Sequence, residues 1–153
     1  MEKLKLNHIK TAPLKQKEVL LWRMLHTEDD GMMYPLPEKN STLWKRLKGA
    51  NAHLVRDQEG TLVGCFSVSI QADGIATGGT AVRNGFRARG MGSQILAVQE
   101  DMARSLVAHS FRCDVFSDNA AGVALMTKNG YRNFQWFEKP LITKIKKKAR
   151  KNE

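Results

Sequence analysis

The run from Ile75 to Gln94 constrains the fold of this 153-residue chain more than any other part of it. Its first half, Ile75–Val82, follows the turn pair Asp73–Gly74, which predicts a short strand entered through a turn. Residues 87–93 form a glycine-containing loop, and apolar residues from Ile95 to Leu106 then recur at helical spacing. A strand that leads through glycines into a helix leaves backbone N–H groups unpaired where the helix dipole favours negative charge. We therefore expect an anion site here, with diphosphate as its usual ligand.

The loop residues alone leave three interpretations open. A dinucleotide-binding loop needs Gly-x-Gly-x-x-Gly and a P-loop needs Gly-Lys-Ser/Thr, and neither pattern is completed around Gly90 and Gly92. The pattern Arg-x-x-Gly-x-Gly, filled by Arg87, Gly90 and Gly92, resembles the acyl-CoA loop of the GNAT superfamily of N-acetyltransferases. A plain strand-to-helix turn, in which glycines only permit tight packing, is the alternative without a ligand.

Length and composition are those of an ordinary globular chain. At 153 residues the chain is long enough to bury a sizeable core, and its 42% hydrophobic and 26% charged residues are typical. We expect one domain over residues 1–146 and a basic tail over 147–153. No apolar run approaches the roughly 18 residues of a membrane span and no secretory signal is evident, so we expect a cytoplasmic protein.

The cysteines and histidines show no metal-binding spacing, and no metal is expected. Cys65 and Cys113 lie inside apolar runs, which indicates reduced, buried and structural thiols.

The formal charge of +10 is the unusual global feature. One explanation is a solvated C-terminal tail, and the other is attraction to RNA or another polyanion. The tail has no interleaved aromatic residues for base stacking, which favours the first explanation. Its basic residues are Lys139, Lys144, Lys146, Lys147, Lys148, Arg150 and Lys151.

The remaining elements follow from periodicity and turn signals. In the first half of the chain, we expect a strand over Leu4–Ile9, a helix starting at Thr11–Pro13, a loop over His26–Pro37, a helix capped by Asn40–Ser41 and ended by Gly49, and a hairpin of Ala52–Val55 and Thr61–Ile70. In the second half, we expect a helix over Gln94–Val107, a strand over Phe111–Phe116, and a helix over Ala120–Asn129 that Ser117–Asn119 can cap, with Gly130 past its end. Strand-like segments are expected over Tyr131–Phe137 and Leu141–Ile145.

A second motif extends the resemblance to nearly the whole chain. Val115–Asn119, followed by Ala124–Tyr131, is similar to the strand–Asn–helix–Gly–aromatic segment of the GNAT superfamily. The resemblance implies an α/β (α+β) fold, with a mixed, mostly antiparallel sheet of six to seven strands and about four helices. It also implies a splay between the fourth and fifth strands, which here end at Val82 and Phe116.

The resemblance implies a site for acetyl-CoA, the acyl-donor substrate. The backbone of Val82 would bond the thioester carbonyl and the pantetheine arm, and Asn119 would also bond that arm. The diphosphate would be held by the loop residues Arg87, Ala88, Arg89, Gly90, Met91, Gly92 and Ser93. The implied reaction is direct attack of a primary amine on the thioester in a ternary complex.

Two positions depart from the family pattern at the catalytic centre. Ala76 stands where members often carry a carboxylate base, and Met126 stands where a tyrosine acid is usual. A thiolate is a good leaving group that water can protonate, so the loss is survivable. Substitutes are Asp73 as base and Ser117 or Tyr34 as proton donor, although each also has a structural explanation as a turn residue, a cap or a pocket wall.

The implied acceptor pocket mixes acidic and aromatic residues, which suits a cationic amine. Its residues are Glu28, Asp29, Asp30, Met32, Met33, Tyr34, Phe134, Trp136 and Phe137. The favoured function is N-acetylation of a small or peptidyl amine. Two alternatives stay open, namely action on RNA-linked amines such as aminoacyl-tRNA and a catalytically silent acyl-CoA-binding module. A homodimer is also left open.

Overall fold

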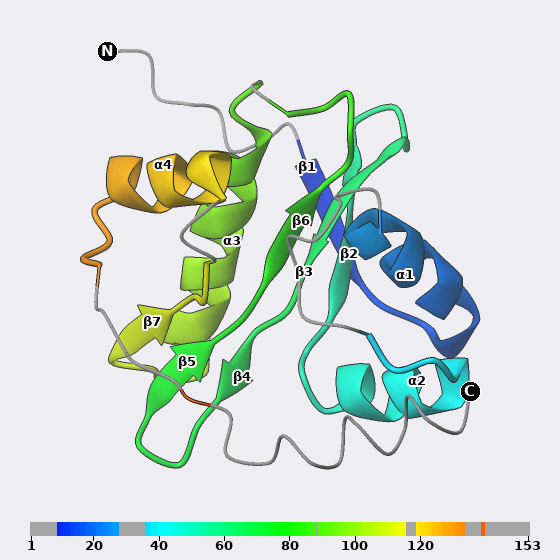
Figure 1. The fold of residues 1–153 in the computed structure, drawn as a ribbon, viewed down its shortest axis with the longest axis horizontal. Helices are drawn as coiled ribbons and strands as arrows, with labels where there is room; N and C mark the ends of the chain where they lie inside the picture. The colour runs from blue at the N-terminus through cyan, green and yellow to red at the C-terminus, as the bar shows by residue number, and fades with distance from the viewer. Residues whose placement is uncertain (1–8, 28–35, 88, 116–118, 134–138, 140–153) are drawn as a thin grey trace.

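The computed structural model describes residues 9–27, 36–87, 89–115, 119–133 and 139 (Figure 1). Seven strands and four α-helices lie in this part of the chain. The strands are β1 (Ile9–Pro13), β2 (His53–Asp57), β3 (Leu62–Phe66), β4 (Ser69–Ile70), β5 (Ile75–Thr77), β6 (Thr80–Val82) and β7 (Ser110–Arg112). The helices are α1 (Val19–Thr27), α2 (Asn40–Lys48), α3 (Met91–Ser105) and α4 (Ala120–Lys128), with a 3-10 turn, η2, over Gln16–Glu18.

The strands form two sheets with the orders β1-β2-β3-β6 and β4-β5-β7. All described pairs are antiparallel except β5 with β7, which is parallel. The expected α/β fold with a mixed, mostly antiparallel sheet and about four helices is therefore confirmed. The run predicted as one strand over residues 75–82 supplies both β5 and β6, so it belongs to both sheets.

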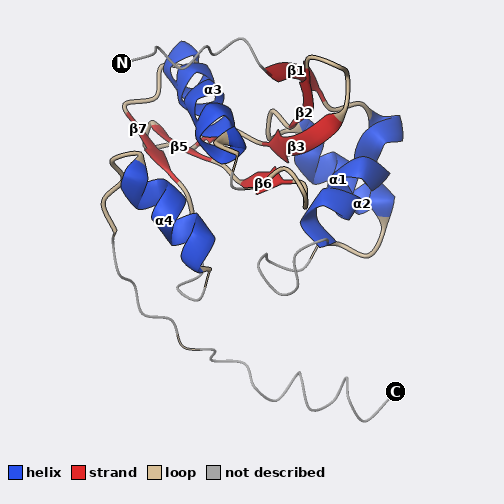
Figure 2. Cartoon of the chain, turned by 90° about the horizontal axis from the view of Figure 1, so that it is seen from above, coloured by secondary structure: helices blue, strands red, loops and turns tan. Residues whose placement is uncertain are grey.

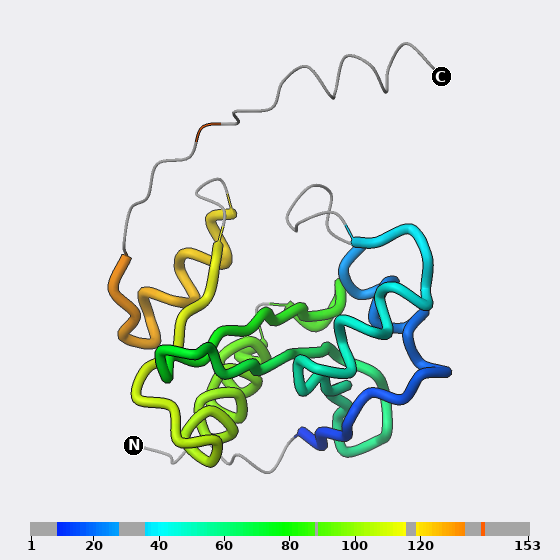
Figure 3. Tube along the Cα trace, turned by 90° about the horizontal axis from the view of Figure 1, so that it is seen from below, coloured from blue at the N-terminus to red at the C-terminus, as the bar shows by residue number. Residues whose placement is uncertain are grey.

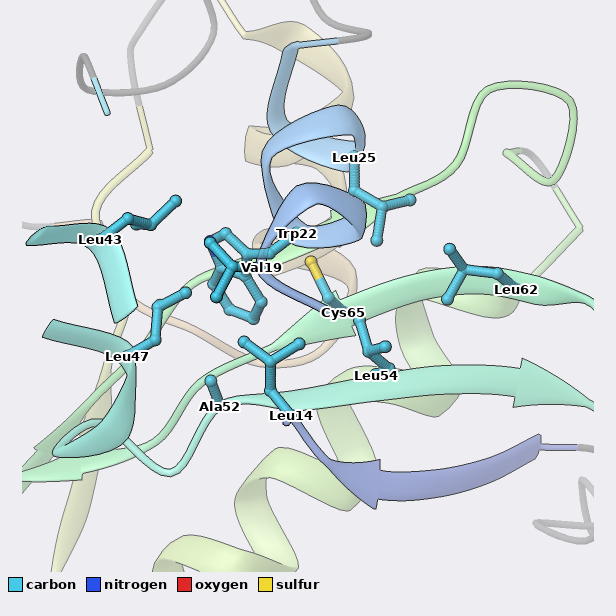
Figure 4. Packing of buried hydrophobic residues seen from close by; sticks show 10 residues of the cluster. All are labelled: Leu14, Val19, Trp22, Leu25, Leu43, Leu47, Ala52, Leu54, Leu62 and Cys65. Carbon is cyan, nitrogen blue, oxygen red and sulfur yellow. The ribbon is translucent and has the colours of Figure 1, made fainter. Parts of the chain in front are cut away.

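Two apolar clusters lie on opposite faces of the four-stranded sheet, with α1 and α2 on one side and α3 on the other (Figure 2). The first cluster joins α1 and α2 to the sheet through Trp22, Leu25, Leu43 and Cys65 (Figure 4). The second joins α3 to the sheet, with Ile95 fully buried. Figure 3 shows α1 and α2 on one flank of the strands and the part from β7 to α4 on the other.

The expected helix start at Thr11–Pro13 is wrong, because these residues end β1. A proline is tolerated there because β1 is an edge strand, and the sheet continues through the N–H of Leu14, which donates to the carbonyl of Ala52 at 2.8 Å. The helical segment starts later, at the turn Gln16–Glu18, where the Glu18 carboxylate accepts the N–H of Lys15 at 3.0 Å. The first part of the predicted strand, residues 4–8, lies outside the described residues.

The expected cap of α2 by Asn40 or Ser41 is also wrong. Both residues lie inside the first turn of α2, whose N-cap is Lys39. The Asn40 side chain instead accepts the Nε–H of Arg23 at 3.0 Å, so it joins α2 to α1. The predicted end at Gly49 is confirmed.

Several element boundaries differ from the predicted ones. The second hairpin arm is divided into β3 and β4, and the strand expected over Phe111–Phe116 ends at Arg112 within the described residues. Helix α3 begins at Met91 rather than Gln94, so Met91, Gly92 and Ser93 belong to its first turn and not to the loop. The segments expected over residues 134–137 and 141–145 lie outside the described residues.

Candidate active site

The strand run over residues 75–82 changes sheets at Gly78 and Gly79. Before these glycines, β5 pairs in parallel with β7, and this pairing ends at Thr77 opposite Arg112. After the glycines, β6 pairs with β3, and the described residues provide no strand on the other edge of β6. β6 and β7 therefore part, as the predicted splay requires, and one edge of β6 has no partner within the described part of the chain.

The main chain of β6 points alternately to β3 and to this open edge. The carbonyl of Gly79 accepts the N–H of Ser67 at 3.0 Å, and the N–H of Arg83 donates to Val63 at 2.8 Å, so these residues face β3. By strict alternation, the N–H and C=O groups of Thr80 and Val82 face away from β3. Val82 was expected from the sequence to supply ligand-binding backbone, whereas Thr80 was not.

Gln99 of α3 holds the change of sheets in place. Its side chain is fully buried, and its Nε2 donates to the carbonyls of Ser67 at 3.0 Å and Gly79 at 3.1 Å. Its Oε1 accepts the hydroxyl of Thr80 at 2.6 Å. The sequence analysis missed this residue, although a glutamine on the buried face of an otherwise apolar helix stripe is the signal that could have revealed it.

The loop after β6 leads to a positively charged helix start. Gly90 adopts a left-handed conformation with φ 74°, and no side chain of the described residues caps the N-terminus of α3. The Nε–H of Arg87 donates to the carbonyl of Val82 at 3.1 Å, and the guanidinium of Arg89 lies 5.5 Å from the centre of the Phe86 ring. A Cβ on Gly90 would meet no atom within 4 Å, so the space beside it is open.

Two of the expected loop residues instead face α4. A Cβ on Gly92 would lie 3.2 Å from Leu125, and the Ser93 hydroxyl accepts the side-chain amide of Asn129 at 3.2 Å. Their backbone N–H groups still belong to the first turn of α3, where they have no partner four residues before them. Ala88 lies outside the described residues.

Asn119 caps α4, as one of the sequence expectations stated. Its Oδ1 accepts the N–H of Gly122 at 2.9 Å, which orients the half-buried side chain. Its Nδ2 has no hydrogen-bond acceptor among the described residues, so it is left to donate elsewhere. At the other end of α4, Gly130 has the expected left-handed conformation, with φ 84°.

The structure does not bring Asp73 together with Val82 and Arg87. The Asp73 carboxylate accepts the N–H of Ile75 at 3.0 Å in the turn between β4 and β5, and this turn lies at the opposite end of the strand run from the loop after β6 (Figure 1). Ser117 and Tyr34 lie outside the described residues, as do the expected acceptor-pocket residues Glu28, Asp29, Asp30, Met32, Met33, Phe134, Trp136 and Phe137.

The two positions that depart from the family pattern are apolar in the structure as in the sequence. Ala76 is fully buried on β5 in the cluster under α3, and Met126 is half-buried on α4. Neither side chain can transfer a proton.

His26 was expected at the start of a loop, but it lies in α1, which packs on β3 and β6. His26 is the penultimate residue of α1 and is 7% exposed. Its Nδ1 donates to the carbonyl of Trp22 at 2.9 Å and lies 3.8 Å from the Cys65 sulfur. Burial lowers the pKa of His26, and the hydrogen bond to Trp22 opposes this shift more weakly.

The cysteines are free, as expected, but they differ in burial. Cys65 is fully buried, and burial raises the pKa of its thiol far above the usual range. Cys113 is only partly buried. The pKa of its thiol is raised to about 12, mainly by burial and less by the negative charges of Asp114 and Glu100. Both thiols therefore stay protonated near neutral pH, which makes them poor nucleophiles.

The described residues show neither a metal-binding cluster nor a membrane-spanning helix. They contain no group of three or more His, Cys, Asp or Glu side chains that could hold a metal ion. None of their helices is long and apolar enough to cross a membrane.

The model of the acetyltransferase (GNAT) family matches residues 19–131, which is more than half of the chain. The chain therefore belongs to the acetyltransferase (GNAT) family, as the motifs predicted. No curated protein matches it.

Solved structures share this fold at low sequence identity. The spermidine/spermine N-acetyltransferase SpeG from Vibrio cholerae, solved in mutant forms, superposes with a TM-score of 0.71 at 15% identity over 86% of this chain and 87% of its own. AAC(6')-Iy, in complex with the bisubstrate analog CoA-S-monomethyl-acetylneamine, gives 0.65 at 14% identity over 87% and 99%. The yncA protein from Salmonella typhimurium, with its cofactor acetyl-CoA, gives 0.67 at 13% identity over 80% and 78%.

Proposed function

We propose that this protein transfers an acetyl group from acetyl-CoA to a primary amine by direct attack in a ternary complex. The observation that carries the proposal is the open edge of β6, where the main chain of Thr80 and Val82 faces the gap that β7 leaves. Unpaired backbone donors at such an edge match the amides and the thioester carbonyl of a pantetheine arm. Family membership and the acetyl-CoA and CoA-analog complexes of similar folds support the same ligand.

The start of α3 suits the diphosphate of acetyl-CoA. The first-turn N–H groups of Met91, Gly92 and Ser93 and the positive end of the helix dipole favour an anion. Arg87 and Arg89 add positive charge, and the sequence from Gly74 to Gln99 contains no acidic residue. The open space beside Gly90 leaves room for the phosphates. Asn119, oriented by its cap on α4, donates Nδ2 to the pantetheine arm, and Ala88 completes the loop.

Direct attack agrees with the state of the cysteines. Cys65 is sealed in the core, and the Cys113 thiol stays protonated, so neither suits a covalent acyl intermediate. The backbone N–H of Val82, aimed at the thioester carbonyl, would also stabilise the oxyanion that forms when the amine attacks.

The acceptor class is a cationic amine. The similar folds include an enzyme named for spermidine and spermine and a complex with an acetylneamine analog. The acidic and aromatic residues that the sequence places between the first two helices and near the C-terminus fit the same chemistry.

Thiol release from acetyl-CoA in the presence of spermidine or neamine tests the proposal. We expect amine-dependent release, with Arg89→Gln raising the KM for acetyl-CoA about tenfold, equivalent to about 1.4 kcal/mol of binding. Arg104→Gln is the matched control, because Arg104 is an exposed residue of α3 paired with Glu100 and Asp101, and we expect no change. Acetyl-CoA binding without turnover of any amine would favour a silent binding module, and turnover only with aminoacyl-tRNA would favour the RNA-linked acceptor.

A further inference from the structure

We propose that His26 accepts the proton of the attacking amine, directly or through one water molecule. This inference rests on the proposed function and names the group that replaces the missing strand carboxylate. No residue between Ile75 and Val82 is titratable, and Met126 cannot donate a proton. A base must therefore come from another element that packs beside β6.

Helix α1 supplies this base, because it packs on β3 and β6. Cys65 of β3 pairs directly with Ala81 of β6, and both side chains belong to the cluster under α1. Figure 4 shows the Cys65 sulfur pointing toward the α1 side chains Trp22 and Leu25. The imidazole of His26 has its Nδ1 3.8 Å from this sulfur, so it lies over the face of the sheet that Cys65 and its pairing partner Ala81 share, one residue along β6 from Val82.

The surroundings of the His26 ring define which nitrogen is the base. Because a carbonyl can only accept, the hydrogen bond to Trp22 requires a proton on Nδ1. Nε2 then carries the lone pair, and it has no hydrogen-bond partner among the described residues. His26 is 7% exposed, so the residue is not completely enclosed in the core.

The same surroundings keep the imidazole neutral. The ring stacks on Trp22, with 4.7 Å between ring centres, and burial disfavours its charged form. The titratable group that faces it from β3 is Cys65, which stays protonated. The nearest cation on its own helix, Arg23, is turned toward the carbonyl of Pro37 and the side chain of Asn40. Neutral imidazole is the form that can accept a proton.

The proton balance of the step is complete. The amine nitrogen forms a bond to the thioester carbonyl carbon, and its surplus proton passes to Nε2. The carbon–sulfur bond then breaks and the electron pair stays on sulfur. The CoA thiolate takes up a proton from solvent or from the His26 imidazolium, which returns the ring to its neutral form.

The test uses His26→Asn in the full chain, because the Asn side-chain amide keeps a donor near the Trp22 carbonyl and removes Nε2. We expect kcat with spermidine or neamine to fall at least about a hundredfold, the usual contribution of a general base. As pH falls through the lowered pKa of His26, the logarithm of kcat/KM should fall more steeply by one proton in the wild type than in the variant. The deprotonation of the amine itself affects both proteins equally. An unchanged kcat with an unchanged pH profile would overturn the proposal.

Two controls separate chemistry from folding. His109→Gln removes another histidine, whose Nε2 donates to the Asp73 carbonyl far from the splay, and Cys65→Ala removes the thiol beside His26. We expect both variants to keep the wild-type pH profile. If Cys65→Ala changes the pH profile of kcat/KM in the same way as His26→Asn, the change comes from altered packing, and the role of Nε2 as the base is overturned.

Nuclear magnetic resonance of ring-labelled histidine gives a readout that does not depend on turnover. The chain has four histidines, and the His26→Asn spectrum identifies the His26 signals. We expect the Nδ1–H tautomer and a shift of these signals when acetyl-CoA is added, while those of His109 stay in place. Acetyl-CoA binding that leaves His26 unshifted would overturn this inference and keep the proposed function, whereas absence of binding would overturn the proposed function.

Discussion

The two halves of the run from Ile75 to Val82 have similar small residues but different neighbours. β5 is paired on both edges, by β4 and by β7, and its middle residue Ala76 is fully buried. β6 is paired with β3 alone among the described strands, and all three of its residues are partly exposed. The paired half is held by hydrogen bonds on both edges. Under the proposed function, the half with an open edge supplies backbone groups to acetyl-CoA, so the site lies where the described sheet lacks a strand.

Gly78 separates the two halves, and its replacement should have the largest effect. A Cβ at this position would overlap the carbonyl oxygen of Ser67, which is backbone and cannot move aside cheaply. We expect Gly78→Ala to lower the free energy of unfolding by about 3 kcal/mol or more, measured by urea denaturation. Gly49→Ala is the control, because a Cβ at this helix end would meet only the Arg46 carbonyl oxygen at 4.0 Å and φ is −89°. Equal stability of the two variants would contradict the close approach of Gly78 to the Ser67 backbone.

Gln99→Leu should have the second largest effect. The change removes the partner of the Ser67 carbonyl and of the Thr80 hydroxyl and one of the two hydrogen bonds to the Gly79 carbonyl, which costs about 2–3 kcal/mol in unfolding free energy. Gln94→Leu is the matched control on the same helix, because it removes a buried oxygen that has no partner. We expect this control to be neutral or stabilising, and a larger loss from Gln94→Leu than from Gln99→Leu would contradict the assignment.

The pH dependence of stability should show the smallest effect. The pKa of His26 is lowered in the folded protein, so the unfolded chain binds a proton first as pH falls. The stability that neutral His26 contributes is complete above pH 6.5 and is lost as pH falls through the lowered pKa, with a slope of at most about 1.4 kcal/mol per pH unit. Urea denaturation at pH 7.5 and 5.5 should show this loss in the wild type relative to His26→Asn. Parallel pH dependence in the two proteins would contradict it.

The sequence predicted the parts of the fold that depend on local signals. The hairpin around Gly60, the helix ends at Gly49 and Gly130, and the cap at Asn119 follow from turn and capping chemistry within a few residues. Pro13 and Asn40 were misassigned because their roles depend on distant partners, an edge strand beside β2 in one case and Arg23 in the other. Local propensity cannot report such contacts.

The candidate site shows the same division. The glycine pattern and the two arginines of the loop predicted the helix start that suits a diphosphate. Gln99, His26 and the outward main chain of Thr80 were missed, because their roles arise only when α1 and α3 pack on opposite faces of the sheet. Gly92 was placed in the loop, whereas helix packing turns it toward Leu125.

Acetyl-CoA binding to the wild type, Gly90→Asp and Gly90→Asn tests the central claim most directly. Asp and Asn both tolerate a left-handed conformation and both cap helices, so they differ in charge and not in fold. At about a hundred times its dissociation constant, acetyl-CoA should stabilise the wild type and Gly90→Asn by roughly 2.7 kcal/mol, visible as a raised melting temperature. The carboxylate of Gly90→Asp should abolish this shift by repelling the diphosphate. An equal shift in Gly90→Asp, or no shift in the wild type, would contradict an acyl-CoA site at the start of α3.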